Sequence, residues 1–376
     1  MKKTIAMLLA GMFTVSCGMV SASAADIGDS LEDMQTAPIS TVTWTQTYQS
    51  VDEMMEDADV NIVGTVISQT VEARGEDAPL YFTHSYVEGN DGELYDVLQT
   101  GAFIDGEKMN IPYDVSLLEV GEEYFFSLNY VDDISYGEYY LIAGGTQGIG
   151  EYDTSLSIVS ALNINERSLF GIMEILQKSD QISVLNLEYP VMATSNPDIT
   201  PDHFMWMKKD INIYIGTRVP DIENCTEDLY QAMVDGADSW NASSEITLSE
   251  HYSSTTADIY MRMSNFGNTS WSGMTYYTDY SSEADPITNK YGLEQVEIHL
   301  NGSSGTSYPN ARKFKHYWQA IACHETGHAF GLMHSLEGQI MYGELERYFN
   351  NSNNWNLYTP TYSDINNLDH IYQDIQ

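Results

Sequence analysis

From about Trp44 to Asp153, apolar runs are divided by polar turn segments, and this strand-like pattern predicts a β-rich domain over residues 40–155. The runs "DVNIVGTVISQTVEA", "LYDVLQTGAFI", "EEYFFSLNYV" and "EYYLIAGGTQGIG" are rich in β-branched and aromatic residues. Turn-forming segments such as "EGNDGE" and "IDGEK" separate them. Short strands at this spacing favour a small barrel or sandwich. We also expect a short helix in "SVDEMMEDAD", before the first strand.

The pattern changes after this domain. Residues 156–178 include "NERSLFGIMEILQ", which predicts an amphipathic helix with Asn165 as its N-cap. The following "YPVMATSNPDITPDH" is rich in Pro, Ser, Thr and Asn, as linkers often are. Residues 156–204 are therefore expected to form a helix and a linker between two domains.

Residues 205–376 combine strand and helix periodicities. The segments "DINIYIGTRV", "ADIYMRMSNF", "GMTYYTDY" and "LEQVEIHLNG" predict strands. Three helices are expected: "TEDLYQAMVDGADSWNAS" with Thr226 as N-cap, a helix from about Ala311 through "FKHYWQAIACHETGHAFGL", and "DINNLDHIYQ" behind Ser363 as N-cap. This order of elements predicts an α+β domain.

The first residues, "MKKTIAMLLAGMFTVSCGMVSASAAD", resemble a secretory signal peptide, with two lysines, an apolar run and a small-residue cleavage site. Residues 1–25 are the expected signal, so the mature chain is expected outside the cell. An uncleaved membrane anchor is one alternative. Lipid attachment at Cys17, which would anchor the protein at a bacterial cell surface, is another. Thr14 argues against lipidation, because Leu usually stands there in lipoprotein signals.

Composition limits the partners of the chain. Fifteen Lys and Arg against 55 Asp and Glu give a formal charge of −40, which repels nucleic acid and anionic membranes. Nucleic-acid binding is therefore excluded, and membrane contact is expected only with lipidation at Cys17. Without the signal, Cys225 and Cys323 remain, and they could form one disulfide in an oxidising compartment or stay as two buried thiols.

Three of the nine histidines stand within "HETGHAFGLMH". Residues four apart share one helix face, so His324 and His328 can present imidazole nitrogens to one zinc ion. Glu325 stands beside the first histidine, where it could act as a general base on a water molecule. Gly331 tolerates positive φ and can end the helix, which lets His334 turn back as a third ligand. Chance would give this spacing about 5 × 10⁻⁵ times per chain of this composition.

This extended motif, followed by "SLEGQIMYGE", resembles the metzincin zinc proteases with their Met-turn. "HAFGLMHS", "IMYG" and the final "YSDINNLDHIYQ" are most similar to the matrixin branch, over residues 205–376. The resemblance implies a zincin-type domain with a mixed sheet and three helices, one catalytic Zn²⁺, Glu325 as base and Met341 as an apolar floor. The zinc ligands that it implies are His324, His328 and His334. It also implies that an extended polypeptide substrate binds along the strand "EQVEIHL".

Some features depart from the matrixin pattern. Gly343 stands where Pro usually follows the Met-Tyr pair, which affects the wall of the substrate pocket that "YGELERYFNNSNNWNLYTPTY" is expected to shape. No ligand set for structural Ca²⁺ is evident, so a calcium requirement stays open. His251 and His299 are candidates for a second zinc, although lone histidines among strands, such as His84, are more often structural. Cys225 as a latency thiolate is disfavoured, because it lies within the catalytic domain.

The leading hypothesis is a secreted zinc-dependent endopeptidase with an N-terminal β-domain whose strand order is similar to OB or netrin-like barrels. In the alternative, that β-domain carries the role by docking to a partner or a surface, and the protease domain is secondary or latent. A third hypothesis makes the N-terminal domain a propeptide-like inhibitor. The intact motif argues against an inert protease, and the oligomeric state stays open.

Overall fold

The computed structural model describes residues 39–44, 48, 51–75, 79–112, 115–145, 147–153, 158–161, 203–220, 228–303, 313–335, 338–343 and 357–375. Residues 37–376 form one compact unit. The predicted signal peptide, the helix behind Asn165, Cys225 and most of the predicted pocket loop lie outside the described residues. No helix of the described segments is both long and apolar enough to span a membrane.

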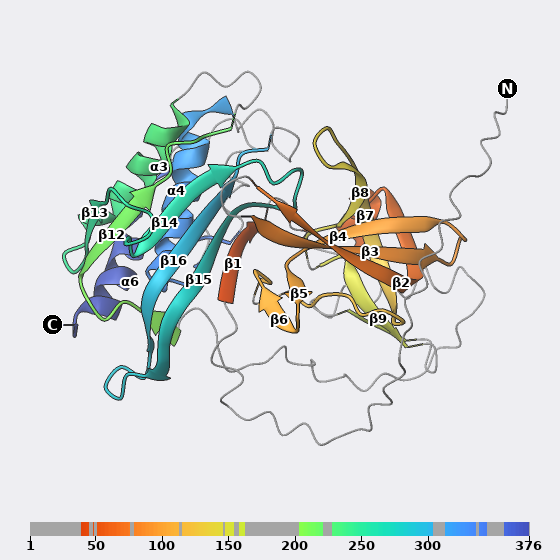
Figure 1. Cartoon of the computed structure of the whole chain (residues 1–376), viewed down its shortest axis with the longest axis horizontal. Helices are drawn as coiled ribbons and strands as arrows, with labels where there is room; N and C mark the ends of the chain where they lie inside the picture. Colours follow the sequence, from red (N-terminus) through yellow and green to blue (C-terminus); the bar gives the residue numbers. More distant parts are fainter. Residues whose placement is uncertain are drawn as a thin grey trace. The chain divides into compact units, whose positions relative to one another are not determined.

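The N-terminal part contains a closed barrel (Figure 1). Its strands are β2 (Val60–Arg74), β3 (Leu80–Gly89), β4 (Leu94–Thr100), β7 (Glu123–Asp133) and β8 (Gly137–Ile142). The barrel closes because β8 pairs in parallel with β4 and antiparallel with β7. Four of these strands coincide with strand-like runs of the sequence, whereas β3 lies in a segment not predicted as a strand. Inward side chains, such as Val66, Val87 and Phe126, form the core.

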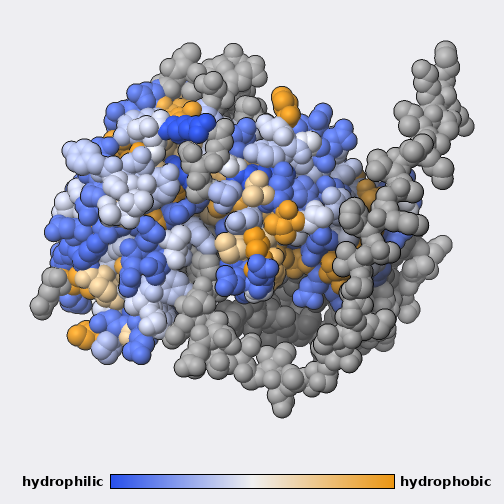
Figure 2. All heavy atoms as spheres, viewed as in Figure 1, coloured by the Kyte–Doolittle hydropathy of each residue, from blue (hydrophilic) through white to orange (hydrophobic). Residues whose placement is uncertain are grey.

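Smaller elements complete this part. They are the helix α1 (Val51–Asp57), the hairpin of β5 (Ala102–Ile104) and β6 (Glu107–Met109), and the strands β9 (Ile149–Asp153) and β10 (Ile158–Ala161) beside β7. The helix lies where the sequence predicts it. Met54 and Met55 pack against Val63 and Phe125 of the barrel. In the view of Figure 2, hydrophilic residues cover most of the described surface, as the acidic composition predicts.

The second sheet is mixed, as the sequence predicts. Its strands are β1 (Ile39–Trp44), β11 (Phe204–Met205), β12 (Asp210–Ile215), β13 (Thr247–Glu250), β14 (Ile259–Ser264), β15 (Trp271–Ala284) and β16 (Tyr291–Asn301). The order is β1-β15-β16-β14-β12-β13, with β11 beside the start of β16. The pairs among β13, β12, β14 and β16 are parallel, whereas β15 runs antiparallel to both β16 and β1.

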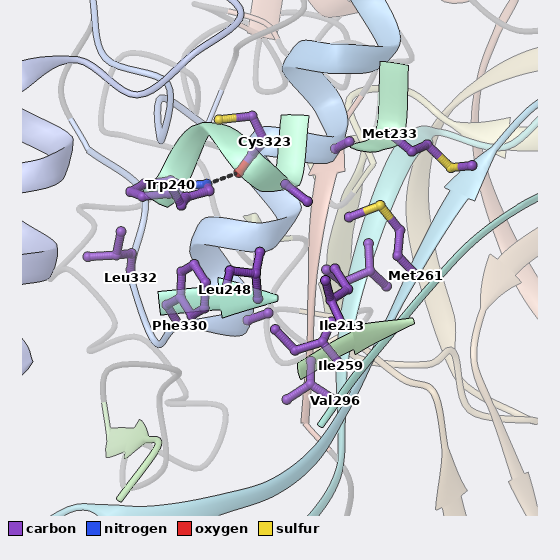
Figure 3. Close-up of a cluster of buried hydrophobic side chains, with 14 of the residues drawn as sticks. Ile213, Met233, Trp240, Leu248, Ile259, Met261, Val296, Cys323, Phe330 and Leu332 are labelled. Atoms are coloured by element: carbon purple, nitrogen blue, oxygen red, sulfur yellow. Dashed lines mark hydrogen bonds between the residues drawn. The ribbon is translucent and has the colours of Figure 1, made fainter. Parts of the chain in front are cut away.

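Three α-helices belong to this sheet among the described residues: α3 (Leu229–Asp238), α4 (Lys315–Ala329) and α6 (Tyr362–Tyr372). A 3₁₀ turn, η2 (Ser239–Ala242), follows α3. The helices and the sheet share one hydrophobic core (Figure 3). Ile213, Met261 and Val296 enter it from the strands, and Met233 and Cys323 enter it from α3 and α4. Burying these side chains fixes α4 against the sheet.

The predicted helix caps are wrong in detail. The N-cap of α3 is Asp228 rather than Thr226, because the Asp228 carboxylate accepts a hydrogen bond from the Gln231 backbone N–H. The N-cap of α6 is Thr361 rather than Ser363, which lies inside the helix. Thr361 and Asp364 form a reciprocal capping box, which satisfies two backbone donors at once.

Candidate metal centre

The end of α4 is a tight left-handed turn. Gly331 has φ of +85°. Its N–H donates to the His328 carbonyl at 2.7 Å, and the Leu332 N–H donates to the Gly327 carbonyl at 3.1 Å, the two bonds of a Schellman motif. A Cβ on Gly331 would also collide with the Phe204 carbonyl. Only glycine satisfies both constraints, so the turn that the sequence predicts is present.

This turn brings three imidazoles together. The ring centroids of His324, His328 and His334 lie 4.7, 4.8 and 5.3 Å apart in pairs. One ligand nitrogen from each ring lies within 4.8 Å of the other two. His324 and His328 are buried, and His334 is on the exposed side. Across the described part of the chain, no other group of His, Cys, Asp or Glu is arranged to hold a metal ion.

The hydrogen bonds of these rings fix where their lone pairs point. The Nδ1 atoms of His324 and His328 lie 2.7 Å from the carbonyl oxygens of Ile340 and Leu332. A carbonyl oxygen only accepts, so each Nδ1 carries the hydrogen and each Nε2 presents a lone pair. Those two Nε2 atoms are 3.0 Å apart.

Burial keeps this pair of imidazoles neutral. It lowers the pKa of His324 to about 3 and the pKa of His328 well below its ordinary value. At neutral pH no proton relieves the repulsion between the facing lone pairs. A cation bound between the two nitrogens would relieve this repulsion. Three neutral imidazoles are a set of donors that suits zinc. The residues therefore fit the metal that the sequence predicts.

Glu325 lies between α4 and β15. Its side chain is fully buried. The Thr275 hydroxyl lies 2.7 Å from the Glu325 carboxylate oxygen Oε2 and 2.9 Å from the Glu325 backbone carbonyl. On the same strand, a Cβ on Gly273 would collide with the Glu325 carboxylate. Thr275 and Gly273 therefore orient Glu325, and the sequence does not reveal either, because nothing in a strand pattern marks a contact 50 residues away.

The segment around Met341 packs against α4. Met341 is 1% exposed, and a Cβ on Gly327 would collide with its Sδ. The buried Asp364 carboxylate accepts from the Ile340 N–H at 3.1 Å and from the Thr361 N–H at 2.7 Å. Asp364 thus ties α6 to this segment. The sequence contains a signal for it, the Thr-x-x-Asp spacing of a capping box.

Gly343 lies against the third histidine. A Cβ at this position would stand 2.9 Å from the His334 Nδ1 and 3.1 Å from its Cγ. The departure from Pro that the sequence shows therefore occurs where a side chain would push on a ring of the metal centre.

Side chains from three other elements hold the backbone of α4. Trp240 Nε1 donates to the Cys323 carbonyl, the Tyr277 hydroxyl donates to the His328 carbonyl, and Trp206 Nε1 donates to the Ala329 carbonyl, all at 2.8 Å. The first of these bonds is drawn in Figure 3. The carbonyls of His328 and Ala329 lie in the last turn of the helix and lack intrahelical donors, whereas that of Cys323 lies further inside the helix. Together the three bonds fix the helix in place.

The other candidate histidines do not form a second zinc site. His299 Nδ1 accepts from Arg262 Nε at 3.1 Å, and its Nε2 faces Glu297 Oε2 at 3.0 Å. His251 is partly exposed, and its Nε2 lies 2.8 Å from a threonine hydroxyl. His84 lies between two carboxylates, as a structural histidine would. The prediction that His251 and His299 are candidate zinc ligands is wrong, because among the described residues neither lies in a group of side chains that could hold a metal ion.

Cys323 is a free, buried thiol. Its Sγ lies 3.3 Å from the Ser239 hydroxyl, and burial raises its pKa above the ordinary value. The disulfide that the sequence allows between Cys225 and Cys323 is therefore not formed.

The predicted substrate edge is wrong as well. The strand "EQVEIHL" belongs to β16, which pairs with β14 on one side and β15 on the other. No peptide can add to a strand that already has two neighbours. Alternation in the sequence shows that a segment is a strand, but it does not show which strands lie beside it. The strand that contacts Glu325 is β15, which pairs with β16 on one side and with the N-terminal strand β1 on the other.

Comparison with known families agrees with this geometry. Residues 205–373 match the family model of the matrixins, a family of peptidases. No curated protein matches the chain.

Proposed function

Residues 205–373 form a matrixin-like catalytic domain of the metzincin type, and so a zinc-dependent metalloendopeptidase domain; on this premise we propose that the chain is a secreted endopeptidase with Glu325 as general base. One observation carries the proposal. Three neutral imidazoles, two of them with facing lone pairs, converge beside a buried carboxylate on the same helix.

The proposed mechanism divides the roles among these residues. His324, His328 and His334 hold the ion, and bound Zn²⁺ supplies the Lewis acidity that polarises the scissile carbonyl and activates water. Glu325 accepts the proton of the attacking water and delivers it to the leaving amine. The Thr275 hydroxyl bond orients the carboxylate for both transfers. Met341 packs against the helix below and keeps that side of the site free of water.

An extended polypeptide is the substrate class that the sheet supports. A peptide that adds to a strand edge forms main-chain hydrogen bonds whatever its side chains are. Within residues 205–373, β13 and β15 are the outer strands of the sheet, and only β15 contacts Glu325. The other side of β15 is paired with β1, a strand from outside these residues, which would have to leave before a substrate could pair there. Substrate is therefore proposed to bind along β15.

The N-terminal part supports two further proposals. Residues 1–25 act as a secretory signal, on the argument from their sequence. The barrel is of the OB type, supported by its five closed strands and by the one parallel pair, β4 with β8.

A cleavage assay tests the proposed function. The full mature chain and Glu325→Ala are each incubated with a peptide library, and zinc content is measured on both. We expect cleavage only by the first, with one zinc per chain in each, because Glu325 does not ligate the metal. Loss of the base should lower kcat/KM by about 10²–10⁴-fold. Cleavage at equal rates by both proteins would remove Glu325 from the mechanism, and absence of zinc from both would overturn the assignment.

A further inference from the structure

The edge of β15 beside Glu325 is already covered by another segment of the same chain. Residues 39–44 form β1, which pairs antiparallel with β15. Thr41 stands opposite Thr275, and Thr43 stands opposite Gly273. The Thr275 hydroxyl bonds to the Glu325 carboxylate, and a Cβ on Gly273 would collide with that carboxylate. A strand from the N-terminus therefore lies where an extended substrate would have to bind.

The central residues of β1 are well packed. Val42 is 2% exposed and belongs to a hydrophobic cluster with Trp271 and Met274 of β15 and Leu80 and Phe82 of the barrel. Burying an apolar side chain in this way stabilises the folded chain. Val42 thus anchors the strand between the barrel and the catalytic sheet.

Thr41 makes the opposite contribution. It is 1% exposed, and its hydroxyl oxygen has no hydrogen-bond partner in the described structure. A buried hydroxyl without a partner destabilises the folded chain, because its hydrogen bonds to water are lost and not replaced. The strand is therefore held, but less firmly than a fully satisfied strand would be. Such a balance suits a segment that leaves the edge when a competitor or a protease acts on it.

The barrel is hydrogen-bonded to the catalytic domain at the loop between β14 and β15, immediately before β15. Four hydrogen bonds join the barrel to the β14–β15 loop: Tyr136 hydroxyl to the Asn265 carbonyl, Arg74 Nη1 to the Phe266 carbonyl, Tyr139 hydroxyl to the Asn268 carbonyl, and the Asn268 N–H to Asp133 Oδ2. Gly267 in that loop has φ of +81°, and a Cβ there would stand 2.6 Å from the Tyr136 ring. Since β1 precedes the barrel in the chain, these hydrogen bonds keep β1 close to β15.

We propose that residues 39–44 are a pseudosubstrate strand that keeps the protease latent, with the barrel as its anchor. This inference rests on the proposed endopeptidase function and deepens it, because it names what regulates the site. The segment "ISTVTW" occupies β15 in place of substrate. Activity rises when the strand is displaced from the edge or cut away from it.

The test places a charge at the anchor of the strand. In Val42→Asp, a carboxylate would have to enter the apolar cluster, so β1 leaves the edge. Val71→Asp is the matched control, since Val71 lies on the barrel strand β2 and is 47% exposed. We expect kcat/KM on a short peptide to rise by about 10-fold or more in Val42→Asp, because the competent fraction of the chain grows, and to stay unchanged in Val71→Asp. A second variant, Asp133→Asn, weakens the hydrogen bond between the barrel and Asn268. Asp132→Asn is its control, because Asp132 is the exposed neighbour of Asp133.

A binding measurement separates this inference from the catalytic proposal. The same changes are introduced into the zinc-loaded Glu325→Ala protein, and a fluorescent peptide "ISTVTW" is titrated by anisotropy against a scrambled peptide. We expect the dissociation constant for the first peptide to fall by about 10-fold or more with Val42→Asp or Asp133→Asn. Tighter binding without cleavage by any variant would support the proposal of a pseudosubstrate strand and would overturn the proposal of an endopeptidase. Equal binding and equal cleavage in wild type and both variants would overturn the pseudosubstrate strand and keep the endopeptidase.

Discussion

Buried histidines lie at two places in the described part of the catalytic domain, the group around His324 and His328 and the single His299, and only the first place is arranged to bind a metal. At the end of α4, backbone carbonyls accept from the Nδ1 atoms, which leaves the Nε2 atoms of His324 and His328 as facing acceptors. On the sheet, His299 receives a hydrogen bond from Arg262 at one nitrogen and faces Glu297 at the other. Burial lowers the pKa of both kinds of histidine. The chemistry of the ring partners, rather than burial, distinguishes a metal site from a structural contact.

The largest difference in zinc content and activity should appear when one histidine is removed at each of the two places. His328→Ala removes a buried ligand, so zinc should be lost and kcat/KM should fall by about 10³-fold or more. His299→Gln removes a ring that already has side-chain partners, so zinc content should stay at one per chain. Metal analysis and peptide cleavage on both proteins check this. Stoichiometric zinc in His328→Ala would show that His328, like His299, is not needed to hold the ion, and would contradict the comparison.

A smaller effect is expected when a ligand is displaced but not removed. In Gly343→Ala the new Cβ would stand 2.9 Å from the His334 Nδ1, so the ring must shift. We expect zinc affinity to fall by about 10–100-fold, the range found when an outer contact of a ligand is changed. Competition with a chelator measures it. Gly216→Ala is the matched control, because its Cβ would meet only ordinary contacts, the nearest at 3.5 Å. Equal affinities in both variants would show that His334 tolerates the shift.

The structural histidine should appear in the pH dependence of stability. Burial, with Arg262 adding to it, lowers the pKa of His299 to about 4 from an ordinary value of 6.5. Between those values the unfolded chain binds the proton and the folded chain does not, so stability is lost as the pH falls from 6.5 to 4. This contribution is at most about 3 kcal/mol.

Urea unfolding at several pH values measures this contribution. His299→Gln should flatten the pH dependence of the free energy of unfolding by that amount relative to wild type. A variant with the same slope as wild type would contradict the assignment of His299 as a neutral buried ring.

The smallest effect is expected at His251. Its side chain is partly exposed, and its Nε2 lies beside the Thr256 hydroxyl. His251→Ala should change the free energy of unfolding by about 0.5 kcal/mol or less, as surface substitutions do, and should leave zinc content and cleavage unchanged. Loss of zinc from this variant would restore His251 as a candidate ligand.

Local signals in the sequence predict the metal centre well. The spacing of His324, His328 and His334 depends on helix geometry and on one turn at Gly331, and both are short-range properties. The caps are less certain, because Asp228 and Thr361 compete with nearby residues of equal capping strength. A choice between such neighbours depends on where the helix axis packs.

Long-range contacts account for what the sequence does not predict. Thr275 orients Glu325 across 50 residues, and Thr41 pairs with Thr275 across a still longer separation. Strand periodicity is the same for an edge strand and for an interior strand. The sequence alone therefore does not separate β16 from β15, the strand along which substrate is proposed to bind. Only the assembled sheet shows that β1 pairs with β15.

X-ray absorption at the zinc edge, on the full mature chain with one equivalent of zinc, tests the central claim most directly. The account predicts three imidazole nitrogens at about 2.0–2.1 Å, and the same spectrum lacking one imidazole in His334→Ala. A sulfur neighbour at about 2.3 Å would contradict it, because a thiolate would then hold the ion. An unchanged spectrum in His334→Ala would contradict it as well, since the third histidine would not be a ligand.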